Sequence, residues 1–446
     1  MDITQCAQKI KQKIKNKNKY EWEVYISQGK GAGLSWSEGS LEEKQYADDG
    51  GIGVRLLSKG RQGFASTNKI DPDEFAGIWQ QAESILQFMP EDTYRMLPEP
   101  AEIHEEDLET FDREIDALDI RGKEDILSSM EKQLLRFDSR IKKSYKIEWN
   151  QGTGKSLLFN SKGVNLTREG TSCSSSVECV AEESGDTQVG AFFQSRRFMQ
   201  DLDLADIPLK AAAITVDQLK GKPIPSGSMP VILEPWVMME FIEMIASAVC
   251  ADNVQKGKSL FKDRIGNAVA SPLVNIIDDA RLKRGIGSGL FDDEGMPTQM
   301  NAIITNGNLQ SFLYDSYTAR KGKTQSTGNA KRPSYRGLPE PGTSNFIMQP
   351  GETLRDAMLK NTARGLRIIH VMGMHTADPI SGDFSLGAVG TLIENGVFTR
   401  PVRGITIAGN IMHMLKDIET ICDDLMIIGS AGSPTVKIKQ MMVGGS

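Results

Sequence analysis

Two Asn-Gly dipeptides constrain the fold of the C-terminal half of this chain more than any other feature of the sequence. Asn306-Gly307 lies within AIITNGNLQSFL and Asn395-Gly396 within TLIENGVFTRPV, each between alternating apolar residues. A type I′ turn needs a positive φ at both central positions, and Asn followed by Gly adopts that conformation readily. Each dipeptide therefore predicts an antiparallel hairpin, so this half of the chain is expected to be rich in β-strands.

The chain has 446 residues, too many for one ordinary hydrophobic core. Its composition changes after residue 89, where an acidic, proline-containing stretch begins, and again at 221–230, where Pro, Gly and Ser cluster. We therefore expect an α+β protein. The expected parts are an N-terminal mixed α/β domain (1–98), a linker with a central α+β domain (99–224), and a C-terminal β-rich domain with antiparallel hairpins (225–446).

Apolar periodicity predicts the main elements of these parts. Helices are expected over 2–18, 74–89, 236–249 and 410–425. Strands are expected over 21–28, 33–39 and 51–67, with glycine-marked turns between them.

Composition also limits the partners and the compartment. The net charge of -7, without clustered Lys and Arg, argues against direct binding to nucleic acid. The five cysteines are scattered, which fits a reducing cytoplasm. The N-terminal MDITQCAQKI has no apolar core, so we expect no signal peptide. The most apolar stretch is interrupted by Glu234, Glu240 and Glu243, so we expect no membrane span.

Three short motifs imitate functional sites without meeting their requirements. GTGKS at 152–156 resembles a phosphate-binding loop, but Trp149 stands at the required first glycine and a strand-like segment follows. GKGAG at 29–33 is also followed by a strand-like segment. His104 and Glu105 begin like a zinc-protease motif, but the second histidine is missing.

The glycine-rich segment HTADPISGDFSLGAVG at 375–390 contains one of the four histidines. A nucleophilic role for Ser381 or Ser385, with His375 as base, would need an oxyanion hole, and GDFSLG is not the GxSxG turn of hydrolases. Residue types alone favour a structural turn over substrate contact.

Four blocks, in order along the chain, resemble the TldD/PmbA family. They are GIGVRLLSKGRQGFAST (51–67), GKSLFKDRIGNAVASPLVNIIDD (257–279), DDEGMPTQMNAIITNGNLQSFLYD (292–315) and GDFSLGAVGTLIENGVFTRPVRGITIAGN (382–410). The resemblance implies a metallopeptidase family that acts on unfolded peptides, some members of which are described as modulators of DNA gyrase. Its TldD-type subunit holds zinc through an HExxxH helix and a later cysteine in a CGKxGQ-like segment. Its PmbA/TldE-type subunit lacks these ligands and pairs with the TldD type.

Ungapped alignment from GKSLFKDRIG places the HExxxH positions at 242–247, so that Ile242 and Ser247 replace the two histidines and Glu243 keeps the place of the general base. Neither replacement is an effective zinc ligand. Cys422 does not match the third ligand, because no CGKxGQ segment surrounds it, and we expect a buried thiol on the last helix. The resemblance therefore implies a PmbA/TldE-type chain without metal or other cofactor.

Without zinc to coordinate, the helix at 236–250 has no reason to be distorted. We expect a regular helix with a buried apolar stripe formed by Met238, Met239, Ile242, Ile245 and Val249.

The most favoured function is a non-catalytic, peptide-binding partner of a TldD-like zinc peptidase in the cytoplasm, with homodimers possible when that partner is missing. His375, Asp383 and Ser385 are the candidates for contact with an extended peptide, for which strand addition is a suitable mode. The glycines of the same loop could instead form a barrel corner with bulges. Two other functions remain open, a stand-alone peptidase using Ser385 and His375, and a non-enzymatic modulator of a protein such as DNA gyrase.

Overall fold

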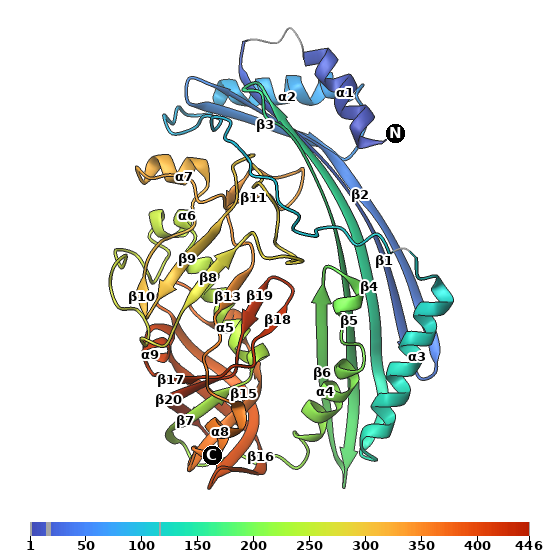
Figure 1. Cartoon of the computed structure of the whole chain (residues 1–446), viewed down its shortest axis with the longest axis vertical. Helices are drawn as coiled ribbons and strands as arrows, with labels where there is room; N and C mark the ends of the chain where they lie inside the picture. The colour runs from blue at the N-terminus through green and yellow to red at the C-terminus, as the bar shows by residue number, and fades with distance from the viewer. Residues whose placement is uncertain (1, 15–18, 116, 446) are drawn as a thin grey trace.

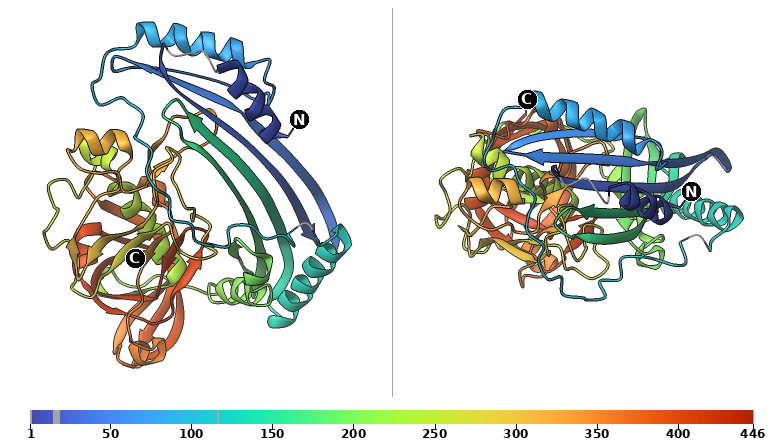
Figure 2. Two further views of the ribbon diagram at one scale, coloured as in Figure 1. Left: turned by 45° about the horizontal axis from the view of Figure 1, so that its top comes forward. Right: turned by 90° about the horizontal axis from the view of Figure 1, so that it is seen from above.

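The computed structural model describes residues 2–14, 19–115 and 117–445. An N-terminal lobe contains one long, curved antiparallel sheet with the strand order β3-β2-β1-β4-β5-β6 (Figure 1). Figure 2 shows this sheet arching over the C-terminal lobe. The strands are β1 (Glu21–Ser37), β2 (Ser40–Ser58), β3 (Arg61–Thr67), β4 (Ile141–Asn160), β5 (Asn165–Glu183) and β6 (Asp186–Arg196).

Alternate residues of this sheet face different surroundings. On β1, Val24 and Ile26 pack with α1 and α2 at one end, and Leu34 and Trp36 lie in the cluster that includes α3 and α4 at the other end. Tyr25, on the opposite face, packs with Tyr335 of the C-terminal lobe. Strand alternation therefore separates a helix-covered face from a face turned toward the C-terminal lobe. The helices are α1 (Ile3–Ile14), α2 (Phe75–Phe88), α3 (Ile120–Phe137), η1 (Met199–Asp201) and α4 (Asp206–Val216).

Two sheets build the C-terminal lobe. The first has the order β16-β15-β14-β7-β20-β17, and β16 also pairs with β20, so that part of it closes into a barrel. The second has the order β10-β9-β8-β13-β19-β18. The strands of the first are β7 (Gly227–Leu233), β14 (Arg364–Met372), β15 (Asp383–Glu394), β16 (Val397–Asn410), β17 (Ile418–Ile421) and β20 (Val436–Gly444). Those of the second are β8 (Ile276–Asp279), β9 (Met300–Thr305), β10 (Asn308–Leu309), β13 (Phe346–Met348), β18 (Met426–Ile428) and β19 (Ala431–Ser433).

Short elements complete this lobe. They are the pair β11 (Ala330–Lys331) and β12 (Glu340–Pro341), and the helices α5 (Pro235–Ala248), α6 (Ala251–Gln255), α7 (Ser316–Lys321), α8 (Arg355–Lys360), η2 (Met374–Thr376) and α9 (Ile411–Lys416). Among the described helices, none combines the length and apolar character needed to cross a bilayer.

The expected α+β architecture with a β-rich C-terminal part is confirmed. Both predicted hairpins are present. Asn306-Gly307 joins β9 to β10, and Asn395-Gly396 joins β15 to β16, with positive φ at all four residues. These turns fix the register of the strands that flank them.

Helix α5 is the apolar centre of the C-terminal lobe. Val237, Met238, Phe241, Ile242 and Ile245 all belong to the main core cluster, together with residues of both sheets. The predicted regular, buried helix is therefore confirmed. The end of β7 leads into it through Glu234, a fully buried carboxylate that accepts hydrogen bonds from Arg355 and Arg367.

Three predicted elements are wrong or lie partly outside the described chain. GKGAG at 29–33 is not a turn but the middle of β1, because β2 and β4 pair with the backbone on both sides. The predicted helix at 410–425 stops at Lys416, since Ile418–Ile421 pairs with β20 as β17. The predicted helix at 2–18 is present as α1, and residues 15–18 lie outside the described residues.

The burial of α5 gives a stability prediction. Ile242→Ala should lower the free energy of unfolding by roughly 2 to 5 kcal/mol, because it leaves a cavity in a fully packed core. Glu243→Ala, on the exposed side of the same helix, should change it by less than about 0.5 kcal/mol. Urea unfolding of both variants measures the difference, and equal stabilities would contradict the central place given to this helix.

Candidate functional site

The residues at the expected zinc position lie on different sides of α5. Ile242 is fully buried in the core, whereas Glu243 and Ser247 are exposed. Ser247 accepts a hydrogen bond from Asn253 through both its hydroxyl and its backbone carbonyl. A buried hydrocarbon and a solvent-facing hydroxyl do not form a pair of metal ligands.

Cys422 does not supply the missing ligand. Its backbone bridges to Thr353 at the end of the barrel and is not helical, so the expected place on a last helix is wrong. Its thiol is buried against the sulfur of Met358 at 3.6 Å. Burial, helped by Asp424, raises the pKa of this thiol to about 12, so that it remains protonated. The residues at these positions therefore do not fit a zinc ion.

One carboxyl near this position titrates close to neutrality. Burial, together with the charge of Glu243, raises the pKa of Glu240 to about 7. The two glutamates are three residues apart, which places them on the same side of α5. This pair was not predicted as a site from the sequence.

The glycine-rich loop at 375–390 forms η2 and the start of β15. His375, Asp383 and Ser385 are all exposed. Asp383 accepts a hydrogen bond from the side chain of Asn410 at 2.8 Å, and Asn410 also caps α9. Asp383 therefore links the loop to the start of α9. Ser385 lies two residues further along β15 and is exposed on the same face of the strand.

Among the described residues, the beginning of β15 pairs with another strand on one side only. Residues 383–386 pair with β16, but pairing with β14 begins only at Gly387. On the other side the described contact is the backbone N–H of Asp378, which donates to the carbonyl of Asp383. This leaves part of a strand edge next to the turn that carries His375.

The proposed serine–histidine pair is not assembled as a nucleophile and base. In the described part of the chain, no hydrogen bond joins Ser385 to His375. The two residues lie on separate elements, β15 and η2.

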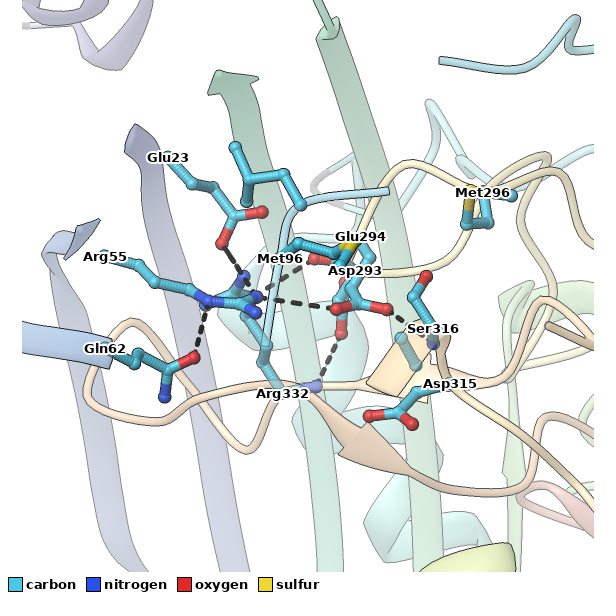
Figure 3. Close-up of polar contacts among 12 residues, drawn as sticks. Glu23, Arg55, Gln62, Met96, Asp293, Glu294, Met296, Asp315, Ser316 and Arg332 are labelled. Atoms are coloured by element: carbon cyan, nitrogen blue, oxygen red, sulfur yellow. Dashed lines mark hydrogen bonds and ion pairs between the residues drawn. The ribbon is translucent and has the colours of Figure 1, made fainter. Parts of the chain in front are cut away.

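A buried network of charges joins the lobes, as Figure 3 shows. Glu23 of β1 pairs with Arg332, which follows β11, and both side chains are only 1% exposed. The backbone and side chain of Arg332 also donate to Asp293. Arg168 of β5 donates to the same aspartate at 2.6 Å. Asp293 therefore binds residues of both lobes.

The network continues through Glu294. Its side chain lies 3.4 Å from Arg55 of β2 and accepts a hydrogen bond from the backbone of Ser316 at 2.9 Å. Gln62 of β3 accepts a hydrogen bond from Arg55. Burial and the charge of Glu294 raise the pKa of Asp315 to about 6. Four strands and two loops thus meet in this polar network. We call the following residues the lobe joint: Glu23, Arg55, Gln62, Arg168, Asp293, Glu294 and Arg332.

The sequence contains only one signal of the lobe joint. Three consecutive acidic residues, Asp292 to Glu294, stand within a family block, but their partners are scattered along the chain. Asp292 accepts hydrogen bonds from the backbones of Glu294, Met296 and Ala330 and fixes this turn. Burial raises its pKa to about 8.

We predict that Arg332→Met lowers the free energy of unfolding by roughly 3 to 5 kcal/mol, because it removes the nearer of the two arginine partners of the buried Glu23 and leaves only Arg55, at 3.7 Å. Adding Glu23→Gln should restore part of the loss, and thermal unfolding measures both variants. Arg336→Met is the matched control, since this nearby arginine is mostly exposed and should matter little. Equal effects of the two arginine variants would contradict the role of the joint.

Three segments of the chain match models of one known protein family. Profiles of the PmbA/TldA metallopeptidase family match three consecutive segments. Domain 1 matches residues 22–86, the central domain 113–219 and the C-terminal domain 226–445.

Individual relatives align over nearly the whole chain. A metalloprotease of Methanocaldococcus jannaschii is 28% identical over 432 residues, which cover 92% of this chain and 91% of that protein. The metalloprotease PmbA of Escherichia coli O157:H7 is 27% identical over 431 residues, which cover 95% of this chain and 92% of that protein. The crystal structure of a candidate modulator of DNA gyrase from Thermotoga maritima MSB8 matches with a TM-score of 0.90 at 26% identity, covering 99% of this chain and 100% of that one. The chain belongs to the TldD/PmbA family.

Proposed function

We propose that this protein is a non-catalytic, peptide-binding partner subunit of a TldD-like zinc peptidase in the cytoplasm. The observation that carries the proposal is Ile242. At a position where the peptidase type of the family would need a zinc-binding histidine, this chain has a fully buried core residue. The exposed Ser247 and the protonated, buried Cys422 do not replace the other ligands.

The free edge of β15 supports the peptide-binding part of the proposal. An extended peptide could pair with backbone groups of residues 383–386, which β14 does not reach. Main-chain pairing of this kind binds peptides with little preference for sequence. Ser385 and His375 border this edge and could donate hydrogen bonds to such a peptide.

The partner subunit would supply the metal and the hydrolytic step. This chain would hold part of the unfolded peptide in an extended conformation beside that centre. Positioning alone makes a large contribution to catalysis, so a subunit without catalytic groups can still determine the rate. A stand-alone peptidase is less well supported, because Ser385 and His375 are not hydrogen-bonded.

We expect the purified chain to carry no stoichiometric zinc after dialysis, because at least three protein ligands are needed to hold the ion tightly. Elemental analysis of the isolated chain measures this directly. About one zinc per chain, retained against a weak chelator, would overturn the non-catalytic assignment.

A second prediction separates peptide contact from local structure at Asp383. Asp383→Asn can keep the hydrogen bond from Asn410 but removes the charge, whereas Asp383→Ala removes both. If the carboxylate contacts peptide, both variants should lower kcat/KM of the two-chain complex by about tenfold, with an unchanged Tm for Asp383→Asn.

The opposite pattern would assign Asp383 a structural role only. In that case Asp383→Asn would cleave peptide like the unchanged complex, and only Asp383→Ala would lower the Tm of the isolated chain. Measuring kcat/KM of the complex and Tm for both variants therefore distinguishes peptide contact from a structural role of Asp383.

A further inference from the structure

An interlobe cleft of about 500 Å³ lies beside the lobe joint. One wall is the face of the long sheet that is turned toward the C-terminal lobe, including Ser27, Ser156 and Arg168. The other wall is formed by loops of the C-terminal lobe, including Lys331 and Arg332. The cleft is therefore formed jointly by residues of both lobes.

A row of glycines leaves the sheet wall without side chains. Gly29 pairs with Gly154, which pairs with Gly170, across three adjacent strands. A Cβ at Gly154 would meet nothing within 4 Å, so this part of the wall is bare backbone. A Cβ at Gly170 would lie 2.5 Å from the guanidinium of Arg197, so the glycine lets that side chain reach across the sheet.

The cations of the cleft are only partly neutralised. Arg332 pairs with Glu23, and Arg168 pairs with Asp293. Arg197 is buried, and its guanidinium donates to the backbone carbonyls of Thr110 and Gly285; among the residues that the structure describes, no carboxylate pairs with it. Its positive charge therefore remains uncompensated.

Lys331 is a second cation that lines the cleft. Within the described ranges its ammonium group forms neither a hydrogen bond nor an ion pair, although Glu340 stands opposite it on β12. Burial and the neighbouring charge of Arg168 lower its pKa, and they outweigh Asp293, Asp278 and Asp292. Those three carboxylates are already hydrogen-bonded elsewhere, Asp278 to Asn329 and Ser344, for example. The three N–H donors of the Lys331 ammonium group are therefore available to a ligand. The lining of the cleft also includes three arginines and three carboxylates, namely Arg168, Arg197, Arg332, Asp49, Glu169 and Asp293.

We propose that the interlobe cleft binds a carboxylate group carried by an extended peptide, with Lys331 as its ion partner. This inference rests on the proposed peptide-binding function and names the charge of the preferred substrate. The carboxylate could be the C-terminus of the peptide or the side chain of an Asp or Glu. The bare wall at Gly29 and Gly154 lets a peptide backbone approach closely, and the field of Arg197 strengthens the attraction.

The chain provides a matched control in Lys155. This lysine lies on β4 between Gly154 and Ser156, so strand alternation directs its side chain to the other face of the sheet. Gly154, Lys155 and Ser156 of GTGKS therefore all border the cleft, but strand alternation directs the ammonium group of Lys155 away from it. Lys155→Met and Lys331→Met remove the same charge from opposite faces, and Lys331→Arg retains a cation in the cleft.

The experiment is titration calorimetry of the full chain at low salt. It compares a short unstructured peptide with a free C-terminus, its C-terminal amide, and a C-terminal amide with one internal Glu. We expect the peptides that carry a carboxylate to bind more tightly than the plain amide. Lys331→Met should weaken their binding by about tenfold or more, Lys155→Met by less than about threefold, and Lys331→Arg should restore most of the affinity. The Tm of Lys331→Met should be unchanged or raised, since an unpaired cation is removed.

Each alternative result is informative. Equal binding of all three peptides would overturn the carboxylate site and leave the proposed peptide-binding function intact. No binding of any peptide would overturn both. Inorganic phosphate that binds in a manner dependent on Lys331, when no carboxylate peptide does, would overturn the carboxylate ligand in favour of a phosphate. If Lys155→Met and Lys331→Met lose the same amount of peptide affinity, the effect depends only on net charge, and this result would also contradict the site.

Discussion

The ion pair between Glu23 and Arg332 is the contact on which the arrangement of the whole molecule depends. It joins the first strand of the long sheet to the C-terminal lobe, and Asp293 extends it to Arg168 on β5. Buried charges of this kind stabilise less than their number suggests, because each must be taken out of water. Each buried charge must nevertheless keep its partners within hydrogen-bonding distance, and this requirement favours one relative position of the lobes. The interlobe cleft, which Lys331 lines, follows from that position.

The second constraint is the apolar core around α5. Ile242, at the position where the resemblance predicts a zinc ligand in the peptidase type, faces the core with Phe241 and Ile245. Phe241 also stacks edge-on against Phe384, with ring centroids 5.1 Å apart. Phe384 lies between Asp383 and Ser385 on β15. The core around Ile242 therefore also supports the strand that carries the candidate peptide contacts.

Local patterns allowed much of the fold to be predicted from the sequence. The two Asn-Gly turns and the buried α5 depend on neighbouring residues, and both predictions are confirmed. GKGAG at 29–33 was wrongly expected to be a turn, because pairing on both sides keeps the glycines extended. The helix expected at 410–425 failed for a similar reason, since β20 recruits Ile418–Ile421 as a strand. The lobe joint was missed because Glu23, Arg168 and Arg332 are far apart in sequence, and nothing local indicates that they meet.

The central claim is that this chain contributes peptide binding but no hydrolytic chemistry. The most direct test mixes it with a TldD-like partner in which one zinc-binding histidine has been replaced, and then measures peptide hydrolysis by the two-chain complex. We predict pairing of the two chains with no hydrolysis above background, and full activity with the unchanged partner. Hydrolysis that persists with the zinc-deficient partner, and that is lost on Ser385→Ala in this chain, would contradict the account.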